Sequence, residues 1–217
     1  MKNLEEFLMK IAVICANGKA GKLIAEEAER RGHEVTAVVR GENSSAAKSA
    51  IIKDLFDLSK DDLKGFDAVV DAFGAWTPET LPQHAASLRK ICDVLSGSPA
   101  RLYVVGGAGS LYLDAEHKTR LMDAPEFPAV FMGVAQATAD AFYELRERKD
   151  VTWTYLCPAA DFRAEGERTG KYKLAGEEFT TNARGESFIS YADYAAAMLD
   201  VIESGKYADE RISVYAE

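Results

Sequence analysis

The chain has 217 residues, of which 47% are hydrophobic and 28% are charged, and its formal net charge is −9. These values exclude a disordered or fibrous chain, and at roughly 150 residues per domain they fit one globular domain. The negative charge argues against nucleic acid and anionic membranes as partners, because binding to phosphate needs a positive surface.

Short apolar runs alternate along the chain with longer amphipathic segments, and Gly32 is a predicted helix stop. We expect strands at residues 10–15, 34–40, 50–53, 66–71, 101–105 and 151–156, and helices at residues 22–31, 80–96, 131–148 and 190–204. Continuous Val- and Ile-rich runs separated by helices are typical of parallel strands buried on both faces. The pattern predicts an α/β fold with a doubly wound, mostly parallel sheet.

The composition changes after Cys157, and we expect a small elaboration at about residues 158–190. Gly176 predicts a hairpin between two short strands, residues 171–174 and 178–181. Ser190 is a candidate N-cap for the last helix, with Asp193 as the acid in its first turn, and we expect a final strand at residues 211–215. We divide the chain into an N-terminal extension, residues 1–9, of which 1–8 are expected to be an exposed helical segment, and one domain, residues 10–217.

The first strand-to-helix turn has the sequence Cys15-Ala16-Asn17-Gly18-Lys19-Ala20-Gly21. In dinucleotide-binding folds, a glycine at the position of Gly18 lets the main chain approach a pyrophosphate, and one at Gly21 lets the helix pack closely on the sheet. The free N–H groups of the helix N-terminus then bind the anion. Cys15 occupies the position of the usual first glycine, where a positive φ would cost about 1–2 kcal/mol. The alternative is a structural turn without a ligand.

Residues that follow the next strands complete a candidate cofactor site. Arg40 ends the second strand, where an arginine accommodates the 2′-phosphate of NADP and an acid would bind the ribose of NAD. This pattern predicts a preference for NADP(H) over NAD(H), with Lys19 as a second phosphate contact, unless Arg40 is only a solvated strand-end charge. Asp54 and Leu55 follow the third strand, where adenine should lie, although Asp54 fits equally well as a turn-forming acid. Residues 72–74 follow the fourth strand at the crevice.

No tyrosine in the chain has a lysine four residues later, so the Tyr-x-x-x-Lys pair of many reductases with this fold is absent. Reduction of a simple ketone creates an alkoxide that needs a nearby acid. A conjugated acceptor spreads the added charge, so a weak donor or water suffices. Trp76 could stack on such a planar substrate, or it could plug the core. The three cysteines and three histidines show no disulfide framework and no metal-ligand spacing.

Five segments resemble the atypical short-chain dehydrogenase/reductases known as NADH-flavin reductases, and more distantly the NADPH-dependent flavin and biliverdin reductases. They are KIAVICANGKAGKLIAEEAERRGHEVTAVVR (10–40), DAVVDAFG (67–74), RLYVVGGAGSLYLD (101–114), CPAADFRAEGERTGKY (157–172) and GESFISYADYAAAMLD (185–200). The resemblance implies that residues 18–21 hold the pyrophosphate, that Arg40 binds the 2′-phosphate, and that Phe73 and Gly74 contact the middle of the cofactor. It places Gly107 and Pro158 beside the nicotinamide and Ser110 near hydride transfer, where a plain loop serine is the alternative.

These observations predict an NAD(P)H-dependent oxidoreductase that transfers hydride to a planar acceptor such as a flavin or a quinone. Ser110 is the candidate catalytic residue, and Trp76 and Phe162 are the candidate substrate contacts. The cofactor-binding candidates are Asn17, Gly18, Lys19, Ala20, Gly21, Arg40, Asp54, Leu55, Phe73, Gly74, Gly107 and Pro158. Two alternatives remain: a non-catalytic NADP(H)-binding redox sensor, and conversion of another metabolite with an acid supplied by Ser110 or water. We expect a cytoplasmic monomer or homodimer with a small-molecule substrate and without metal, nucleic acid or membrane partners, since the longest uncharged run, residues 127–139, is too short to span a bilayer.

Overall fold

The computed structural model describes residues 8–217, so residues 1–7 of the expected helical extension lie outside the described part. The main sheet contains β1 (Lys10–Ile14), β2 (Glu34–Val39), β3 (Ser49–Ile52), β4 (Ala68–Asp71), β5 (Arg101–Val105), β6 (Trp153–Cys157), β8 (Tyr172–Ala175) and β10 (Glu210–Ala216). The helices are α1 (Lys19–Arg30), α2 (Gln83–Leu95), α3 (Ala129–Arg146) and α4 (Tyr191–Ser204). None of the helices in residues 8–217 is long and apolar enough to cross a membrane.

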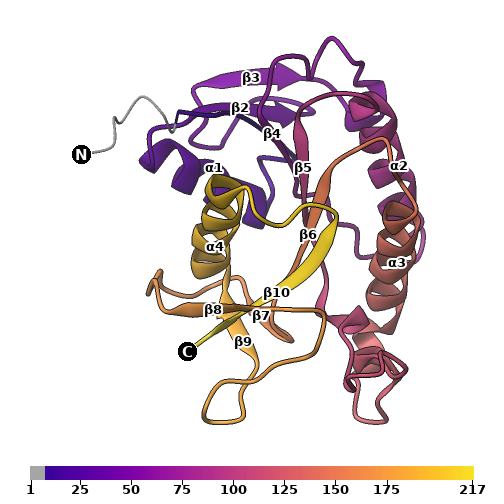
Figure 1. Ribbon diagram of the computed structural model, residues 1–217. Helices are drawn as coiled ribbons and strands as arrows, with labels where there is room; N and C mark the ends of the chain where they lie inside the picture. Colours follow the sequence, from indigo (N-terminus) through magenta and orange to yellow (C-terminus); the bar gives the residue numbers. More distant parts are fainter. Residues whose placement is uncertain (1–7) are drawn as a thin grey trace.

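The strand order of the main sheet is β3-β2-β1-β4-β5-β6-β10-β8 (Figure 1). All neighbouring strands run parallel except β10 and β8, which are antiparallel. The expected doubly wound, mostly parallel sheet is therefore confirmed. The direction of winding reverses between β1 and β4, and in open α/β sheets ligands bind at this point, outside the carboxyl ends of the strands.

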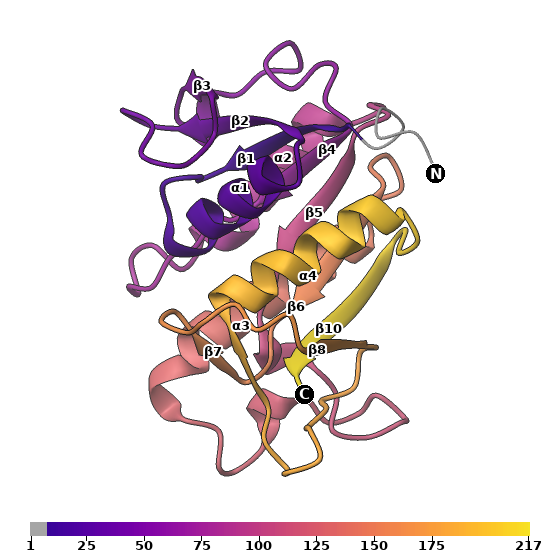
Figure 2. The ribbon, with the colours of Figure 1, turned by 90° about the vertical axis from the view of Figure 1, so that its left-hand side faces the viewer.

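Two helices cover each face of the sheet, and alternate residues of each strand enter the two cores. On β1, Ile11 and Val13 pack with α1 and α4, whereas Ala12 and Ile14 pack with α2 and α3. Figure 2 shows α1 and α4 side by side in front of the sheet. Burial on both faces explains why the strands read as continuous apolar runs.

The helix ends follow local signals in the sequence. Gly32 adopts a φ of 89° directly after Arg31, the C-cap residue of α1, as expected of a helix stop. The Ser190 hydroxyl accepts a hydrogen bond from the Asp193 amide at 3.0 Å, which confirms the predicted cap of α4. However, α1 begins at Lys19, three residues before the predicted start, so the end of the glycine loop is already helical.

The predicted hairpin around Gly176 is wrong. Strand β8 pairs instead with β10, while residues 178–181 form only an isolated bridge from Glu178 to Tyr112. All four residues of β8 pair with β10, and the Ser213 hydroxyl donates to the Gly176 carbonyl just after β8. Two further short strands, β7 (Asp161–Arg163) and β9 (Phe188–Ser190), form a separate parallel pair.

Candidate functional site

The loop from β1 to α1 lies at the switch point of the sheet. The Gly18 amide donates to the Cys15 carbonyl at 2.9 Å and the Cys15 amide donates to the Val38 carbonyl at 3.0 Å, which fixes a tight turn. Cys15 has a φ of 59°, the left-handed conformation that glycine adopts most easily. The first position of this loop therefore does require the conformation that explains a glycine there, and Cys15 adopts it with a side chain.

The two remaining glycines are required for different reasons. A Cβ on Gly21 would lie 2.5 Å from the Cys15 carbonyl oxygen, so any side chain there would push α1 away from β1. A Cβ on Gly18 would lie 3.2 Å from the same oxygen, which is tight but can be relieved by a small shift. Gly18 is exposed and Gly21 is buried. This division fits a ligand approaching the main chain at Gly18 and close helix packing at Gly21.

The first turn of α1 presents free N–H groups. Gly18 is the N-cap residue, the turn contains no acidic residue, and within residues 8–217 no side chain caps it. Asn17 does not serve as a cap, because its amide donates to the Glu42 carbonyl and its oxygen accepts from Ser44. Lys19 is exposed and Ala20 is half-buried at the start of the helix. Main chain without a side-chain cap at a helix N-terminus fits the pyrophosphate of a dinucleotide.

The ends of β2, β3 and β4 converge on this loop. Arg40, Asp54 and Asp71 all act electrostatically on Cys15, which places them around the same crevice. Arg40 is exposed, and Leu55 is buried under the β3 end. The Asp54 carboxylate accepts a hydrogen bond from the Phe56 amide at 2.9 Å and caps a short turn, as expected of a turn-forming acid.

Asp71, at the end of β4, was not singled out from the sequence. Burial raises its pKa to about 6, although its carboxylate accepts a hydrogen bond from the Phe73 amide. Burial together with the Asp71 carboxylate also raises the pKa of the Cys15 thiol to about 12, against the opposing effect of Arg40. The thiol is therefore protonated and does not add negative charge to the phosphate site. An acid at a strand end was the only local signal for Asp71.

A cavity of about 20 Å³ lies below the crevice. It is lined by Asp71, Phe73, His84, Ser87, Leu88, Val104, Val105, Thr138, Ala141 and Tyr155. This volume admits about one water molecule. The His84 Nε2 lies 3.0 Å from the Ala75 carbonyl, and burial lowers the pKa of His84, so its imidazole is neutral at pH 7 and holds the segment after β4.

Ser110 lies on a short helical turn after β5 and is only 2% exposed. The guanidinium of Arg211, on β10, donates 3.0 Å hydrogen bonds to both the hydroxyl and the carbonyl oxygen of Ser110. Arg211 is itself buried, paired with Glu177 at 2.9 Å and stacked on the rings of Tyr112 and Phe142. Sequence reasoning missed Arg211, which is 101 residues away. Ser110 thus has a structural partner and does not line the cavity below the crevice.

A Ser110→Ala variant separates the two roles of this serine. A serine that donates a proton in the reaction would lose about 10²–10⁴-fold in kcat. Because the hydroxyl is buried against Arg211, we expect instead less than a threefold loss of kcat and about 1–2 kcal/mol less stability. Turnover of the folded fraction and denaturant unfolding measure the two effects, and a hundredfold loss of kcat at wild-type stability would establish a catalytic serine.

Of the remaining predicted residues, Phe73, Gly74 and Trp76 follow β4, and Phe162 lies on β7. Gly74 and Trp76 are exposed, so Trp76 does not plug the core. Phe73 packs edge-on against His84, with ring centroids 5.5 Å apart. Phe162 packs against the rings of Tyr191 and Tyr194, with centroids 3.9 and 4.8 Å away.

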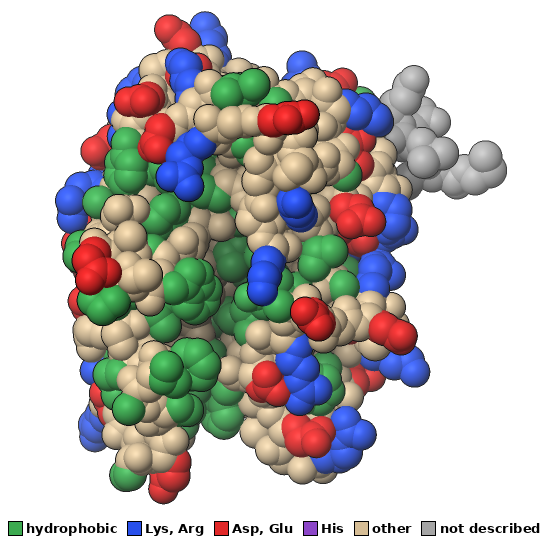
Figure 3. Space-filling view, turned by 180° about the vertical axis from the view of Figure 1, so that it is seen from behind, with side chains coloured by type: hydrophobic (Ala, Val, Ile, Leu, Met, Phe, Trp, Pro, Cys, Tyr) green, Lys and Arg blue, Asp and Glu red, His purple; other side chains and the backbone are tan. Residues whose placement is uncertain are grey.

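Gly107 and Pro158 follow β5 and β6 at the same edge of the sheet. Pro158 is buried, and a Cβ on Gly107 would lie 2.9 Å from the Thr138 hydroxyl of α3. In the view of Figure 3 the surface is hollowed near its middle, and hydrophobic side chains gather around the hollow.

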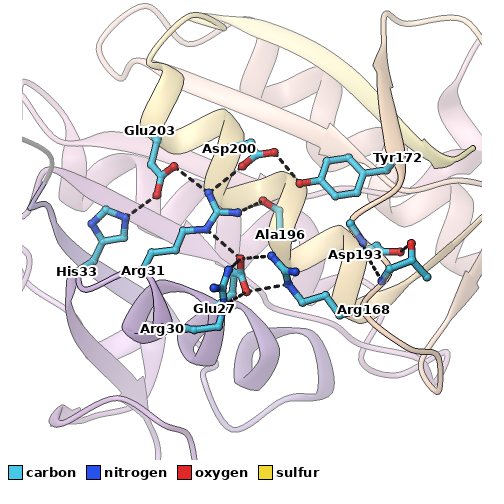
Figure 4. Close-up of polar contacts among 12 residues, drawn as sticks. Glu27, Arg30, Arg31, His33, Arg168, Tyr172, Asp193, Ala196, Asp200 and Glu203 are labelled. Carbon is cyan, nitrogen blue, oxygen red and sulfur yellow. Dashed lines mark hydrogen bonds and ion pairs between the residues drawn. The ribbon is translucent and has the colours of Figure 1, made fainter. Parts of the chain in front are cut away.

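The GERTGKY segment, residues 166–172, anchors the elaboration to the two helices on one face of the sheet (Figure 4). Arg168 donates hydrogen bonds to Glu27 of α1, the Thr169 hydroxyl and the Gly170 amide donate to Asp193 of α4, and the Tyr172 hydroxyl donates to Asp200. Glu27 is almost fully buried and also accepts hydrogen bonds from Arg30 and Arg31. Arg31 continues the network to Asp200 and Glu203, and His33 also contacts Glu203.

Glu27→Gln should reduce stability by about 2–4 kcal/mol, because it leaves the surrounding arginines without their shared carboxylate. Burial alone would raise the pKa of Glu27, but hydrogen bonds from Arg30, Arg168 and Arg31 lower it to about 2. The stabilisation is therefore complete above about pH 4.5 and declines as the pH falls towards 2. Denaturant unfolding across this range should show the gap between wild type and variant closing. Glu26→Gln, on the exposed side of α1, is the control; an equal loss there would contradict this assignment.

Known proteins are similar to this chain over most of its length. A family model described as NAD(P)H-binding matches residues 15–205. YwnB of Bacillus subtilis is 44% identical over 212 residues, which cover 96% of this chain and 99% of YwnB.

Two solved structures extend the comparison. A Streptococcus pneumoniae protein described as "a putative NADH-flavin reductase" is 56% identical, covers 96% of this chain and 100% of its own, and superposes with a TM-score of 0.94. A "putative epimerase" from Bacteroides thetaiotaomicron is 35% identical, covers 97% of this chain and 98% of its own, and superposes with a TM-score of 0.81. The two descriptions name different reactions, so the choice of activity depends on the site itself.

Proposed function

Since the chain belongs to the NAD(P)H-binding family, we propose that it is an NAD(P)H-dependent oxidoreductase that transfers hydride to a planar conjugated acceptor. The observation that carries this proposal is the combination at the end of β1. There, an exposed glycine, Gly18, and an α1 N-terminus without a side-chain cap lie at the switch point of the sheet. The description of the pneumococcal relative supports the redox character.

The chain's own residues bind and orient the cofactor. Gly18, Lys19, Ala20 and Gly21 would hold the pyrophosphate, and the segment at Phe73 would contact the middle of the molecule. When bound, the reduced nicotinamide supplies a hydride. Residues 8–217 contain no Tyr-x-x-x-Lys pair, and the Ser110 hydroxyl is buried. Because neither can serve as the proton donor, these observations support an acceptor that takes its proton from water.

The charges at the end of β2 support a proposed preference for NADP(H). Arg40 is exposed beside the crevice, and no acid occupies the strand end. A guanidinium attracts a 2′-phosphate, whereas a carboxylate would repel it. Lys19, at the start of α1, would add a second positive charge.

The proposal is tested by mixing the protein with NADPH and either FMN or a simple quinone and following the loss of reduced-nicotinamide absorbance. We expect saturable turnover that disappears in a variant unable to bind the pyrophosphate. Calorimetry that detects no binding of NADPH or NADH would refute the proposal outright.

A non-catalytic NADP(H) sensor is the second candidate. The enclosure of Ser110 by Arg211 favours it, because a sensor needs the cofactor site but no proton donor. Tight NADPH binding without turnover of any flavin or quinone would select the sensor.

A further inference from the structure

The start of α3, residues 129–133, is apolar and exposed. Pro128–Gly133 are all exposed, although a surface helix normally buries one side. Val130 is 81% exposed, Phe131 52% and Met132 40%. Together with Trp76, which is 69% exposed, these three residues make up what we term the apolar lip. They are four of the eight large hydrophobic side chains exposed in residues 8–217.

The lip is continuous with the candidate site. A Cβ on Gly74, at the edge of the crevice, would lie 3.5 Å from the Trp76 indole nitrogen, so the indole folds back over Gly74. A Cβ on Gly133 would lie 2.9 Å from the Leu81 side chain, so α3 contacts the segment that carries Trp76. The two parts of the lip therefore belong to one surface.

The apolar lip lies where an acceptor stacked on the nicotinamide would extend. Thr138 of α3 lies beside Gly107, which follows β5, because a Cβ on Gly107 would lie 2.9 Å from the Thr138 hydroxyl. Phe131 lies seven residues earlier on the helix, or about 10 Å further out. The start of α3 thus overhangs the strand ends, outside the place expected for the nicotinamide.

The lack of charged residues beside the apolar lip indicates which class of acceptor it fits. No charged residue occurs in residues 127–139 or in residues 72–78, and the flanking groups Glu79, Glu126 and Asp140 are acidic. A phosphate-bearing acceptor such as FMN would meet no cation from either of these two segments, while an uncharged ring with an apolar substituent would cover their exposed side chains.

From this arrangement we infer that the acceptor is an uncharged quinone-type ring with an apolar substituent, and that the apolar lip binds this substituent. The inference rests on the proposed function. In the reaction the quinone accepts the hydride from the reduced nicotinamide and one proton from water and becomes the hydroquinone, and the nicotinamide is left oxidised.

The test compares quinones that share one ring and carry apolar tails of increasing length, with FMN as the charged acceptor. For the wild type we expect KM to fall several-fold with each lengthening of the tail, and kcat/KM for FMN to be at least tenfold lower than for the tailed quinone. Phe131→Ser should raise KM for the tailed quinone at least tenfold and leave KM for NADPH unchanged. Leu8 is also an exposed apolar residue, but it precedes β1 and so lies at the amino end of that strand, away from the carboxyl ends. Leu8→Ser is therefore the matched control and should change neither the KM for the tailed quinone nor the KM for NADPH.

A second readout does not require turnover. Titration of the tailed quinone should quench the fluorescence of exposed Trp76, and Phe131→Ser should weaken this binding at least tenfold. If no acceptor is turned over but quenching behaves in this way, the proposed function fails and the lip is retained as a binding surface. If FMN and tailed quinones react equally well, or if Phe131→Ser changes neither KM nor quenching, the inference is wrong. It is equally wrong if sedimentation shows that Phe131→Ser converts a dimer to monomers.

Discussion

Gly18→Asp is expected to abolish NADPH binding while leaving the fold intact. Gly18 is the N-cap residue of α1, with φ −70° and ψ 163°, and aspartate is one of the preferred residues at this position. Its carboxylate would therefore accept hydrogen bonds from the N–H groups that the pyrophosphate needs, and it would repel the phosphates. We expect the affinity for NADPH to fall at least a hundredfold and Tm to stay the same or rise.

Two measurements and a neighbouring variant make this result specific. Calorimetry gives the affinity and thermal unfolding gives Tm for the same preparation. Gly21→Ala should behave in the opposite way, losing stability because its Cβ would lie 2.5 Å from the Cys15 carbonyl oxygen. Wild-type affinity in Gly18→Asp would show that the cofactor does not rest on this loop.

Arg40→Glu is expected to reverse the cofactor preference. The substitution places a carboxylate where the 2′-phosphate of NADPH would lie, and removes the cation that favours it. We expect the affinity for NADPH to fall at least a hundredfold at low salt, whereas the affinity for NADH changes less than threefold. Calorimetric titrations with both cofactors at a fixed ionic strength measure the ratio, since screening by salt reduces such effects.

Lys64→Glu makes the same change in net charge at an exposed position before β4, away from the carboxyl ends of the strands. Both affinities should remain close to wild type in this control. An equal loss of NADPH and NADH binding in Arg40→Glu would mean that Arg40 supports the whole site and does not discriminate between the cofactors.

Features encoded in short stretches of sequence could be predicted. The strands β1, β2, β4, β5 and β6 read as apolar runs because both faces of the sheet are buried there, whereas the edge strand β3 is mostly exposed. The glycine loop was predicted from the strand, the glycines and the helix that follow one another in the sequence. The residues of this loop and those after β2 and β4 were brought together because the carboxyl ends of parallel strands meet at one edge.

Features that depend on distant contacts could not be predicted. Arg168 is 141 residues from Glu27, and Arg211 is 101 residues from Ser110, so no local spacing reports either contact. The predicted partner strand of β8 was wrong for a related reason. Alternation of side chains identifies a strand but not its neighbour, and the open edge of β10 formed the ladder that a hairpin was expected to form.

Strand β10 is an interior strand of the sheet, between β6 and β8, although it is made of residues 210–216. During synthesis the ribosome delivers β6 and β8 before the strand that joins them. Until then, β6 has an open edge that can pair with other chains, β8 has no partner, and Ser110 lacks the Arg211 guanidinium. Nascent chains of this protein therefore pass through a stage in which a molecular chaperone would have an unfinished sheet to protect.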